Sequence, residues 1–150
     1  MTHFFIPGHP RPQGSKRHVG NGVLVESSGH HAAWRAKCVQ VLKLHHRGET
    51  HTGAVGVMVS FVMPRPKRPK YNHPYQGDLD KLQRTLGDAL ELAGVIANDA
   101  HIVCWQPIKR FARPGEQPGA YVRLETNQKV LDEWIDACDS YTMPPIPRPA

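Results

Sequence analysis

Residues 77–90 read Gly-Asp-Leu-Asp-Lys-Leu-Gln-Arg-Thr-Leu-Gly-Asp-Ala-Leu. Apolar side chains recur through this stretch at steps of three and four, which predicts an amphipathic α-helix that buries one face; the recurring residues are Leu79, Leu82, Leu86, Leu90 and Ala93. Gly94 is the expected helix stop, because glycine commonly follows the last helical turn. The turn at 97–99 then brings in another acid before a new strand begins.

The opposite face of this helix is polar and carries Asp80, Arg84 and Asp88. Residues four apart form one stripe, because four residues turn a helix by about 400°. Asp78 lies at the mouth of the helix, and Asp99 follows after the turn. On spacing alone, an aspartate at a helix N-terminus is more often a cap with a solvated face than a ligand.

The same acids also suit a divalent metal. Mg²⁺ prefers oxygen ligands and keeps several waters, so one or two carboxylates per ion suffice. Crowded carboxylates repel one another unless a cation neutralises them. Asp78, Asp80 and Asp99 are therefore a candidate open site for Mg²⁺, with Mn²⁺ as the other option, and sites of this kind commonly hydrolyse phosphodiesters. Arg84 is placed to hold a phosphate or to stabilise transition-state charge.

The stretch from Asp78 to Val103 resembles the RusA family of Holliday junction resolvases. The family pattern runs as Asp-x-Asp-Asn-Leu-x-Lys, then Asp-Ala-Leu, then Asp-Asp-x-Gln/His-Ile/Val. This chain matches it at residues 78–84, 88–90 and 98–103, with the acids in step. A weaker match covers Ile6 to Arg17, which looks like the opening strand and basic loop of the family.

The resemblance implies that Asp78, Asp80 and Asp99 are the catalytic, metal-binding carboxylates. It implies a supporting rather than catalytic role for Asp88. It also implies a homodimer, which agrees with the two symmetric cuts that a four-way junction needs.

Three positions depart from the family pattern. Lys81 replaces an asparagine, Arg84 replaces a catalytic lysine, and Asn98 replaces the first acid of the Asp-Asp pair. Arg84 keeps the positive charge but presents a rigid fork instead of a compact ammonium. Asn98 can still offer an oxygen to a metal or its water, so we expect activity to survive with an altered metal preference or rate.

Composition bounds the class of protein. The chain has 150 residues, 39% hydrophobic and 21% charged, which fits one globular domain. A formal net charge of +6 points to a polyanionic partner. We expect no membrane span and no signal peptide. The three widely spaced cysteines predict a reducing, cytoplasmic location, and the lack of a Cys-x-x-Cys pair argues against a structural zinc site.

Basic segments predict contacts with DNA phosphates. Residues 64–70 place four cations among three prolines, which makes a stiff extended arm just before the acids. The loop at 9–17 is also basic. For both segments an ordinary solvated loop is the competing interpretation. The candidate DNA-binding residues are Lys16, Arg17, Arg65, Lys67, Arg68, Lys70 and Lys81.

Three further groups of residues bear less directly on function. Tyr71, His73 and Tyr75 fit either stacking on exposed bases or packing against the domain. Lys109, Arg110 and Arg113 add a further basic cluster, and the paired histidines at 30–31 and 45–46 are expected to be exposed and polar.

The predicted fold is α+β, with a mixed sheet of about four or five strands and two or three helices. Strands are expected at 4–6, 54–63, 101–111 and 120–125, and a hairpin at 19–26 turning at 20–22. Strand 54–63 is expected to be central, and Pro107 confines strand 101–111 to an edge or a bulge. Helices are expected at 29–46 and 128–138. One domain then spans 1–142, before a Pro-rich tail at 143–150 that we expect to be disordered.

The residues together with the resemblance favour a metal-dependent endonuclease that resolves Holliday junctions by paired symmetric nicks in recombination and repair. Because the family often travels with phages, the resemblance also implies a role in processing phage DNA. Two alternatives stay open. The first is a non-catalytic junction-binding protein, because of Lys81, Arg84 and Asn98. The second is a broader nuclease for branched DNA. Trp134 and the exposed side of the sheet are the candidate dimer interfaces.

Overall fold

The computed structural model describes residues 2–14, 16–18, 20–26 and 29–142. Its main sheet has four strands in the order β1-β6-β4-β5. β4 and β5 are parallel, and the other neighbours are antiparallel. The bounds are β1 (Thr2–Pro7), β4 (Val55–Met63), β5 (Ile102–Phe111) and β6 (Gly119–Glu125). The predicted α+β class with a four-stranded mixed sheet is confirmed.

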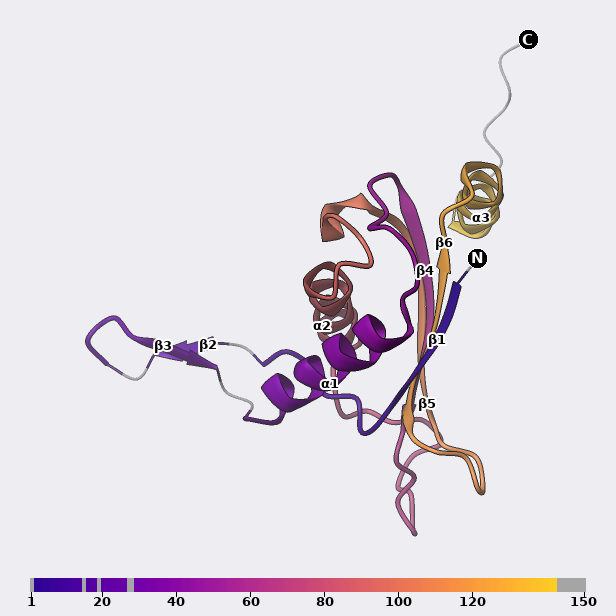
Figure 1. The fold of residues 1–150 in the computed structure, drawn as a ribbon. Coiled ribbons are helices and arrows are strands. Elements are labelled where there is room, and N and C mark those ends of the chain that lie inside the picture. The colour runs from indigo at the N-terminus through magenta and orange to yellow at the C-terminus, as the bar shows by residue number, and fades with distance from the viewer. Residues whose placement is uncertain (1, 15, 19, 27–28, 143–150) are drawn as a thin grey trace.

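Three α-helices pack on this sheet: α1 (Gly29–His45), α2 (Leu79–Leu92) and α3 (Gln128–Thr142). Figure 1 shows α1 and α2 side by side on one face, whereas α3 covers only one end of the other face. A short helix, η1 (Asp99–His101), precedes β5. Within the described residues, none of the helices has the length and apolar character that crossing a bilayer requires.

β4 is the central strand, as predicted, because it pairs with β5 on one side and β6 on the other. Alternate residues of β4 face α1 and α2 and are at most 4% exposed, as expected for a strand buried in the middle of a sheet. The apolar stripe of α2 meets them: Leu82, Leu86 and Leu90 are almost fully buried. α2 ends before Gly94, which has a φ of +72° and confirms the expected helix stop.

β5 lies at the edge of the sheet, where Pro107, which has no N–H, is tolerated. β6 follows β5 in the chain but does not pair with it. Instead β6 is inserted between β1 and β4, because β4 offers one free edge after pairing with β5. The connection from β4 through α2 to β5 is therefore a parallel crossover. This crossover contains both Asp80, on α2, and Asp99, in the turn that leads into β5.

α3 reaches the sheet through Gly56 of β4. A Cβ at Gly56 would lie 2.7 Å from Cδ1 of Leu131 and 3.0 Å from the Trp134 ring, so only glycine allows this close packing. Trp134 is 9% exposed, and the Arg123 guanidinium lies 4.8 Å from its ring centroid. The expectation that Trp134 forms a dimer interface is therefore wrong, because its own chain covers it.

Three other expectations change. β2 (Lys16–His18) and β3 (Leu24–Glu26) form a hairpin that turns at 20–22 as predicted. In Figure 1 the hairpin extends away from the rest of the domain. Its first strand begins at Lys16, inside the segment 9–17 that was expected to be a loop. His31 is fully buried rather than exposed, because it continues the buried stripe of α1 through Trp34 and Cys38. α3 runs beyond the predicted end at Cys138. The tail 143–150 lies outside the described residues.

The junction of β1 and β6 requires glycine at position 119. Gly119 has a φ of +159°, and a Cβ there would lie 2.3 Å from the carbonyl oxygen of Ile6 and 2.8 Å from the Phe5 ring. Because that oxygen belongs to the backbone of a paired strand, the clash cannot be relieved by a side-chain movement. We expect Gly119→Ala to lower the free energy of unfolding by about 3 kcal/mol, measured by urea denaturation.

Gly115→Ala is the matched control. Gly115 also has a positive φ, +76°, but no atom lies within 4 Å of the position that its Cβ would occupy. Its substitution should therefore cost only the backbone strain, about 1 kcal/mol. Equal losses for the two variants would show that the contact with β1 does not limit position 119.

Candidate active site

The N-terminal turns of α2 present the first site residues. Asp80 lies in the first turn, where the positive end of the helix macrodipole favours a negative charge. Arg84 follows one turn later on the same face, and both side chains are exposed. This placement follows from the amphipathic pattern, since the leucines of α2 occupy the sheet-facing side.

The turn after α2 returns Asp99 to the flank of that helix. The backbone N–H of Asp99 donates to Oε2 of Glu91 on α2 at 3.0 Å. Asn98 caps η1, because its Oδ1 accepts the N–H of Ala100 at 2.8 Å. The turn is also fixed from the other side, where the N–H of Ala97 donates to the carbonyl of His51 at 2.9 Å. Asp99 is thus held by backbone contacts and not by its own carboxylate.

Asp80 and Asp99 line one surface hollow of about 260 Å³, which we call the acidic hollow. Gly87 of α2 lies beside it, and a Cβ there would be 3.8 Å from the Cβ of Asp99, so the helix backbone and the returning turn are in close contact. The full lining is Asp80, Gln83, Arg84, Gly87, Asp99, Ile102 and Trp105. The structure therefore brings together Asp80, Arg84 and Asp99 from two separate segments.

The pKa of the Asp88 carboxyl is raised from its ordinary value. Burial raises the pKa of its carboxyl, and the negative charge of Asp99 raises it further. The guanidinium groups of Arg35 and Arg84 act in the opposite direction. Asp88 is half-buried behind the hollow and does not line it, which fits the supporting role expected for it. The raised pKa of Asp88 thus results first from burial and second from the nearby carboxylate of Asp99.

Asp78 is placed differently from the other two acids. Its carboxylate is 3.1 Å from Nζ of Lys81, its side chain is 64% exposed, and it does not line the acidic hollow. Asp78 precedes the helix, but its side chain makes no capping hydrogen bond. Among the described residues, no three His, Cys, Asp or Glu side chains are arranged to hold one metal ion. The three-carboxylate site thus stays a prediction, and the geometry gathers two of its members.

Two carboxylates at an open hollow still fit Mg²⁺. This ion keeps several waters and is commonly bound through one or two carboxylates plus substrate phosphate oxygens. Asp80 and Asp99, which line the same hollow, meet that requirement. The side-chain oxygen of Asn98 accepts one hydrogen bond in capping η1, and the contact with a metal or its water that the sequence suggests stays a prediction.

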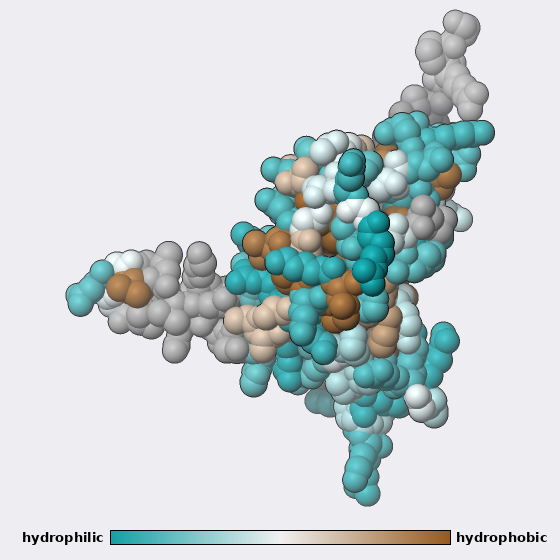
Figure 2. Space-filling model, viewed as in Figure 1, coloured by the Kyte–Doolittle hydropathy of each residue, from teal (hydrophilic) through white to brown (hydrophobic). Residues whose placement is uncertain are grey.

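The basic arm at 64–70 is exposed and contains neither helix nor strand, as predicted. It forms the lower projection of Figure 1, and Figure 2 shows hydrophilic residues covering that projection. Tyr71 and Tyr75 follow the arm and stack on each other with centroids 4.2 Å apart. They remain 44% and 67% exposed, so the pair does not pack into the domain core. The side chains of Lys16 and Arg17 lie outside the described residues.

The basic cluster of Lys109, Arg110 and Arg113, at the end of β5 and in the turn after it, mainly makes contacts within the domain. Arg110 binds Glu116 through two hydrogen bonds of 2.6 and 2.8 Å, which lower the pKa of Glu116 to about 2. Lys109 donates from Nζ to the carbonyl of Gly77 at 2.8 Å, which fixes the start of α2 against β5. Arg113 is exposed in the following turn. Two of the three cations therefore position the chain itself.

Sequence reasoning missed Gln83 and Trp105, which also line the acidic hollow. Gln83 had a usable signal, because it lies three residues after Asp80 on the same helix and therefore near its face. No local sequence pattern indicates that Trp105 lines the hollow, because its position there depends on the parallel pairing of β5 with β4.

The described chain thus combines an acidic hollow with an exposed basic arm on a positively charged α+β domain, a combination that suits a nuclease. The comparison with protein families agrees with that class. Residues 7–125 of the 150 match the family described as endodeoxyribonuclease RusA, so the chain belongs to this family. Membership identifies an endodeoxyribonuclease of the Holliday junction resolvase kind. A search of curated proteins found no match.

Proposed function

We propose that this protein is a Mg²⁺-dependent, cytoplasmic endonuclease that resolves four-way DNA junctions by paired symmetric nicks during recombination and repair. The observation that carries the proposal is the convergence of Asp80 and Asp99, from α2 and from the turn after it, on one hollow that Arg84 also lines. A nuclease needs this combination, because a phosphodiester must be neutralised and its attacking water oriented.

Asp80 and Asp99 would hold the ion, which when bound supplies a Lewis acid and lowers the pKa of a water. Arg84 would bind a non-bridging oxygen of the scissile phosphate and stabilise the charge that develops there. Asp88 would orient Arg84 from the helix side, consistent with the electrostatic coupling between the two. Gln83 is placed on the same rim to donate a hydrogen bond to the DNA.

Asp78 would join these ligands by leaving Lys81. Their ion pair is 3.1 Å long and partly exposed, with 64% of the Asp78 side chain open to solvent. An exposed pair of this kind contributes about 1 kcal/mol or less, so its release costs little. Lys81 would then turn toward a DNA phosphate, the contact that the sequence predicts for it.

The arm supplies the remaining DNA contacts in this proposal. Prolines keep it extended, so its cations can follow a phosphate backbone without a further loss of chain entropy. Its contacting residues would be Arg65, Lys67, Arg68 and Lys70. The exposed stack of Tyr71 and Tyr75 offers an aromatic surface for bases unpaired at the crossing.

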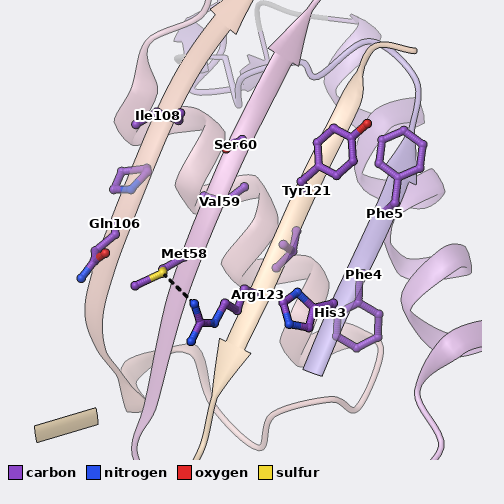
Figure 3. A pocket seen from close by; sticks show the side chains of 12 residues that line it. His3, Phe4, Phe5, Met58, Val59, Ser60, Gln106, Ile108, Tyr121 and Arg123 are labelled. Atoms are coloured by element: carbon purple, nitrogen blue, oxygen red, sulfur yellow. Dashed lines mark hydrogen bonds between the residues drawn. The ribbon is translucent and has the colours of Figure 1, made fainter. Parts of the chain in front are cut away.

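Two symmetric cuts require two active sites, and we propose that a second copy packs on the sheet face that α3 leaves bare. Figure 3 shows this face, with the Phe5 and Tyr121 rings beside each other. It forms a shallow hollow of about 600 Å³, and Ile108 and Tyr121 are 53% and 41% exposed on it. A phosphate backbone would not cover an apolar surface, whereas a protein partner would.

A cruciform plasmid tests paired cutting. Two cuts in one encounter linearise the plasmid, whereas a single nick only relaxes it. We expect Ile108→Asp to give a monomer by light scattering, because the buried charge opposes pairing, and to yield relaxed rather than linear plasmid. Leu44→Asp is the control, since Leu44 is also an exposed apolar residue but lies on α1 and does not line this hollow. A wild-type monomer, or a dimeric Ile108→Asp variant, would overturn the assigned interface.

A further inference from the structure

A second charged hollow, separate from the acidic hollow, lies between the end of β1, the first turns of α1 and the turn that leads into β6. We call it the basic hollow. Its volume is about 470 Å³, and the described residues that line it include no Asp or Glu. The side chains that define it are His9, Arg11, His30, Trp34, Lys37 and Gln117.

The hollow has a rigid floor. Trp34 is 4% exposed, and Gly8 packs so closely on its ring that a Cβ there would lie 3.1 Å from Cζ3. The N–H of Gly8 donates to the carbonyl of Pro118 at 3.0 Å, which joins the end of β1 to the opposite wall. His30 lies in the first turn of α1, where the helix macrodipole adds positive potential.

The charged side chains among the described residues of this hollow are all basic, so their positive charges repel one another. Burial lowers the pKa of His9, and the positive charges of Arg11 and His30 lower it further. Lys37 is exposed two turns along α1 and completes the set. The groups that face His9 from the loop after β1 and from α1 are thus all basic, and Gln117 on the remaining wall is neutral. An anion bound in the hollow would relieve this repulsion.

The loop at 9–13 connects the basic hollow to the catalytic helix. Pro12 packs against Gly77 just before α2, with its Cδ 3.5 Å from the position of a Gly77 Cβ. The N–H of Gln13 donates to the carbonyl of Lys81 at 3.4 Å. His9 also lines a hollow shared with Lys70 and Tyr71 of the arm region. The basic hollow is therefore continuous with the surface that carries the arm and the start of α2.

We propose that the basic hollow binds a backbone phosphate of the junction DNA, away from the phosphate that is cut, through the side chains of Arg11, Lys37, His9 and His30. This inference rests on the proposed function, because it names a further contact with the same substrate. The ligand chemistry is a phosphodiester, which carries the negative charge that the hollow lacks.

The first test measures the affinity for a synthetic four-way junction by fluorescence anisotropy, in EDTA so that the DNA stays intact. We expect Lys37→Gln and Arg11→Gln each to weaken binding roughly 3- to 10-fold and to reduce the slope of log affinity against log salt by about 1. Lys43→Gln is the matched control, because Lys43 is exposed on the same helix but lines a different surface, and it should behave as wild type.

The second test uses pH. The pKa of His9 lies below its ordinary value in the DNA-free protein, so we expect junction affinity to tighten as the pH falls from about 7 to 5, where His9 gains the charge that favours phosphate binding. The double variant His9→Gln/His30→Gln should lose part of that dependence, whereas His45→Gln, exposed at the end of α1, should keep it.

The outcomes distinguish a failure of the proposed function from a failure of the phosphate site alone. A wild-type protein that does not bind four-way junctions would overturn the proposed function. A wild-type protein that binds them, with Lys37→Gln and Arg11→Gln indistinguishable from Lys43→Gln in affinity and salt slope, would overturn the phosphate site alone.

Discussion

Asp80→Asn should abolish DNA cutting while leaving four-way junction affinity close to that of the wild type. Asp80 is exposed at the rim of the acidic hollow. The substitution keeps the shape of the side chain but removes the charge that would hold the ion, so we expect the cutting rate to fall by roughly 10³-fold or more. Binding should persist, because the basic arm and the basic hollow supply the phosphate contacts.

Two assays on the same protein preparation check this prediction: anisotropy for binding and strand cleavage in Mg²⁺ for cutting. Asp136→Asn is the control, since Asp136 is exposed on α3 and lies outside the acidic hollow. Equal loss of binding and cutting in Asp80→Asn would contradict the catalytic assignment, and unchanged cutting would exclude Asp80 as a required ligand.

Arg84→Gln should slow cutting by roughly 10²-fold with little change in junction affinity, because its cation acts on charge that develops during the reaction. Arg84→Lys should retain most of the activity. The family pattern has a lysine at this position, and a lysine preserves the charge while losing the planar fork.

Single-turnover cleavage rates of the wild type, Arg84→Lys and Arg84→Gln show whether the reaction needs the positive charge of residue 84 or the planar shape of its guanidinium group. The account expects the order wild type and Arg84→Lys far above Arg84→Gln. If Arg84→Gln cuts at the wild-type rate, the role given to Arg84 is wrong. If both variants are equally slow, the guanidinium fork and not the charge is what the reaction needs.

The parts of the fold that the sequence predicted well have strong local periodicity. The leucines of α2 and the alternating valines of β4 each define one buried face, and both elements formed within a residue or two of the expected ends. β2 was missed because Lys16–His18 has no alternating apolar pattern. The position of β6 between β1 and β4 depends on long-range pairing, which local patterns do not encode.

Burial of individual side chains was harder to foresee. His31 lies three residues before Trp34 and therefore on the buried face of α1, but its polarity favoured an exposed interpretation. Trp134 was taken as an interface residue, whereas Gly56 within β4 was the unused signal, because a glycine inside a strand marks a close approach.

The candidate site follows partly from helix geometry. The spacing of Asp80 and Arg84 predicted a shared face, and the short turn predicted the return of Asp99 to α2. The ion pair of Asp78 with Lys81 and the cap made by Asn98 depend on rotamers and local turns, so the sequence alone did not separate Asp78 from the other acids.

The most direct measurement of the central claim is strand cleavage of a synthetic four-way junction beside a linear duplex of the same sequence, with Mg²⁺, with Mn²⁺ and with EDTA. The account predicts paired symmetric nicks across the junction that require a metal, and little cutting of the duplex. Equal cutting of both substrates would indicate a broader nuclease. Tight junction binding with no cleavage in either metal would contradict the claim and show a junction-binding protein without catalysis.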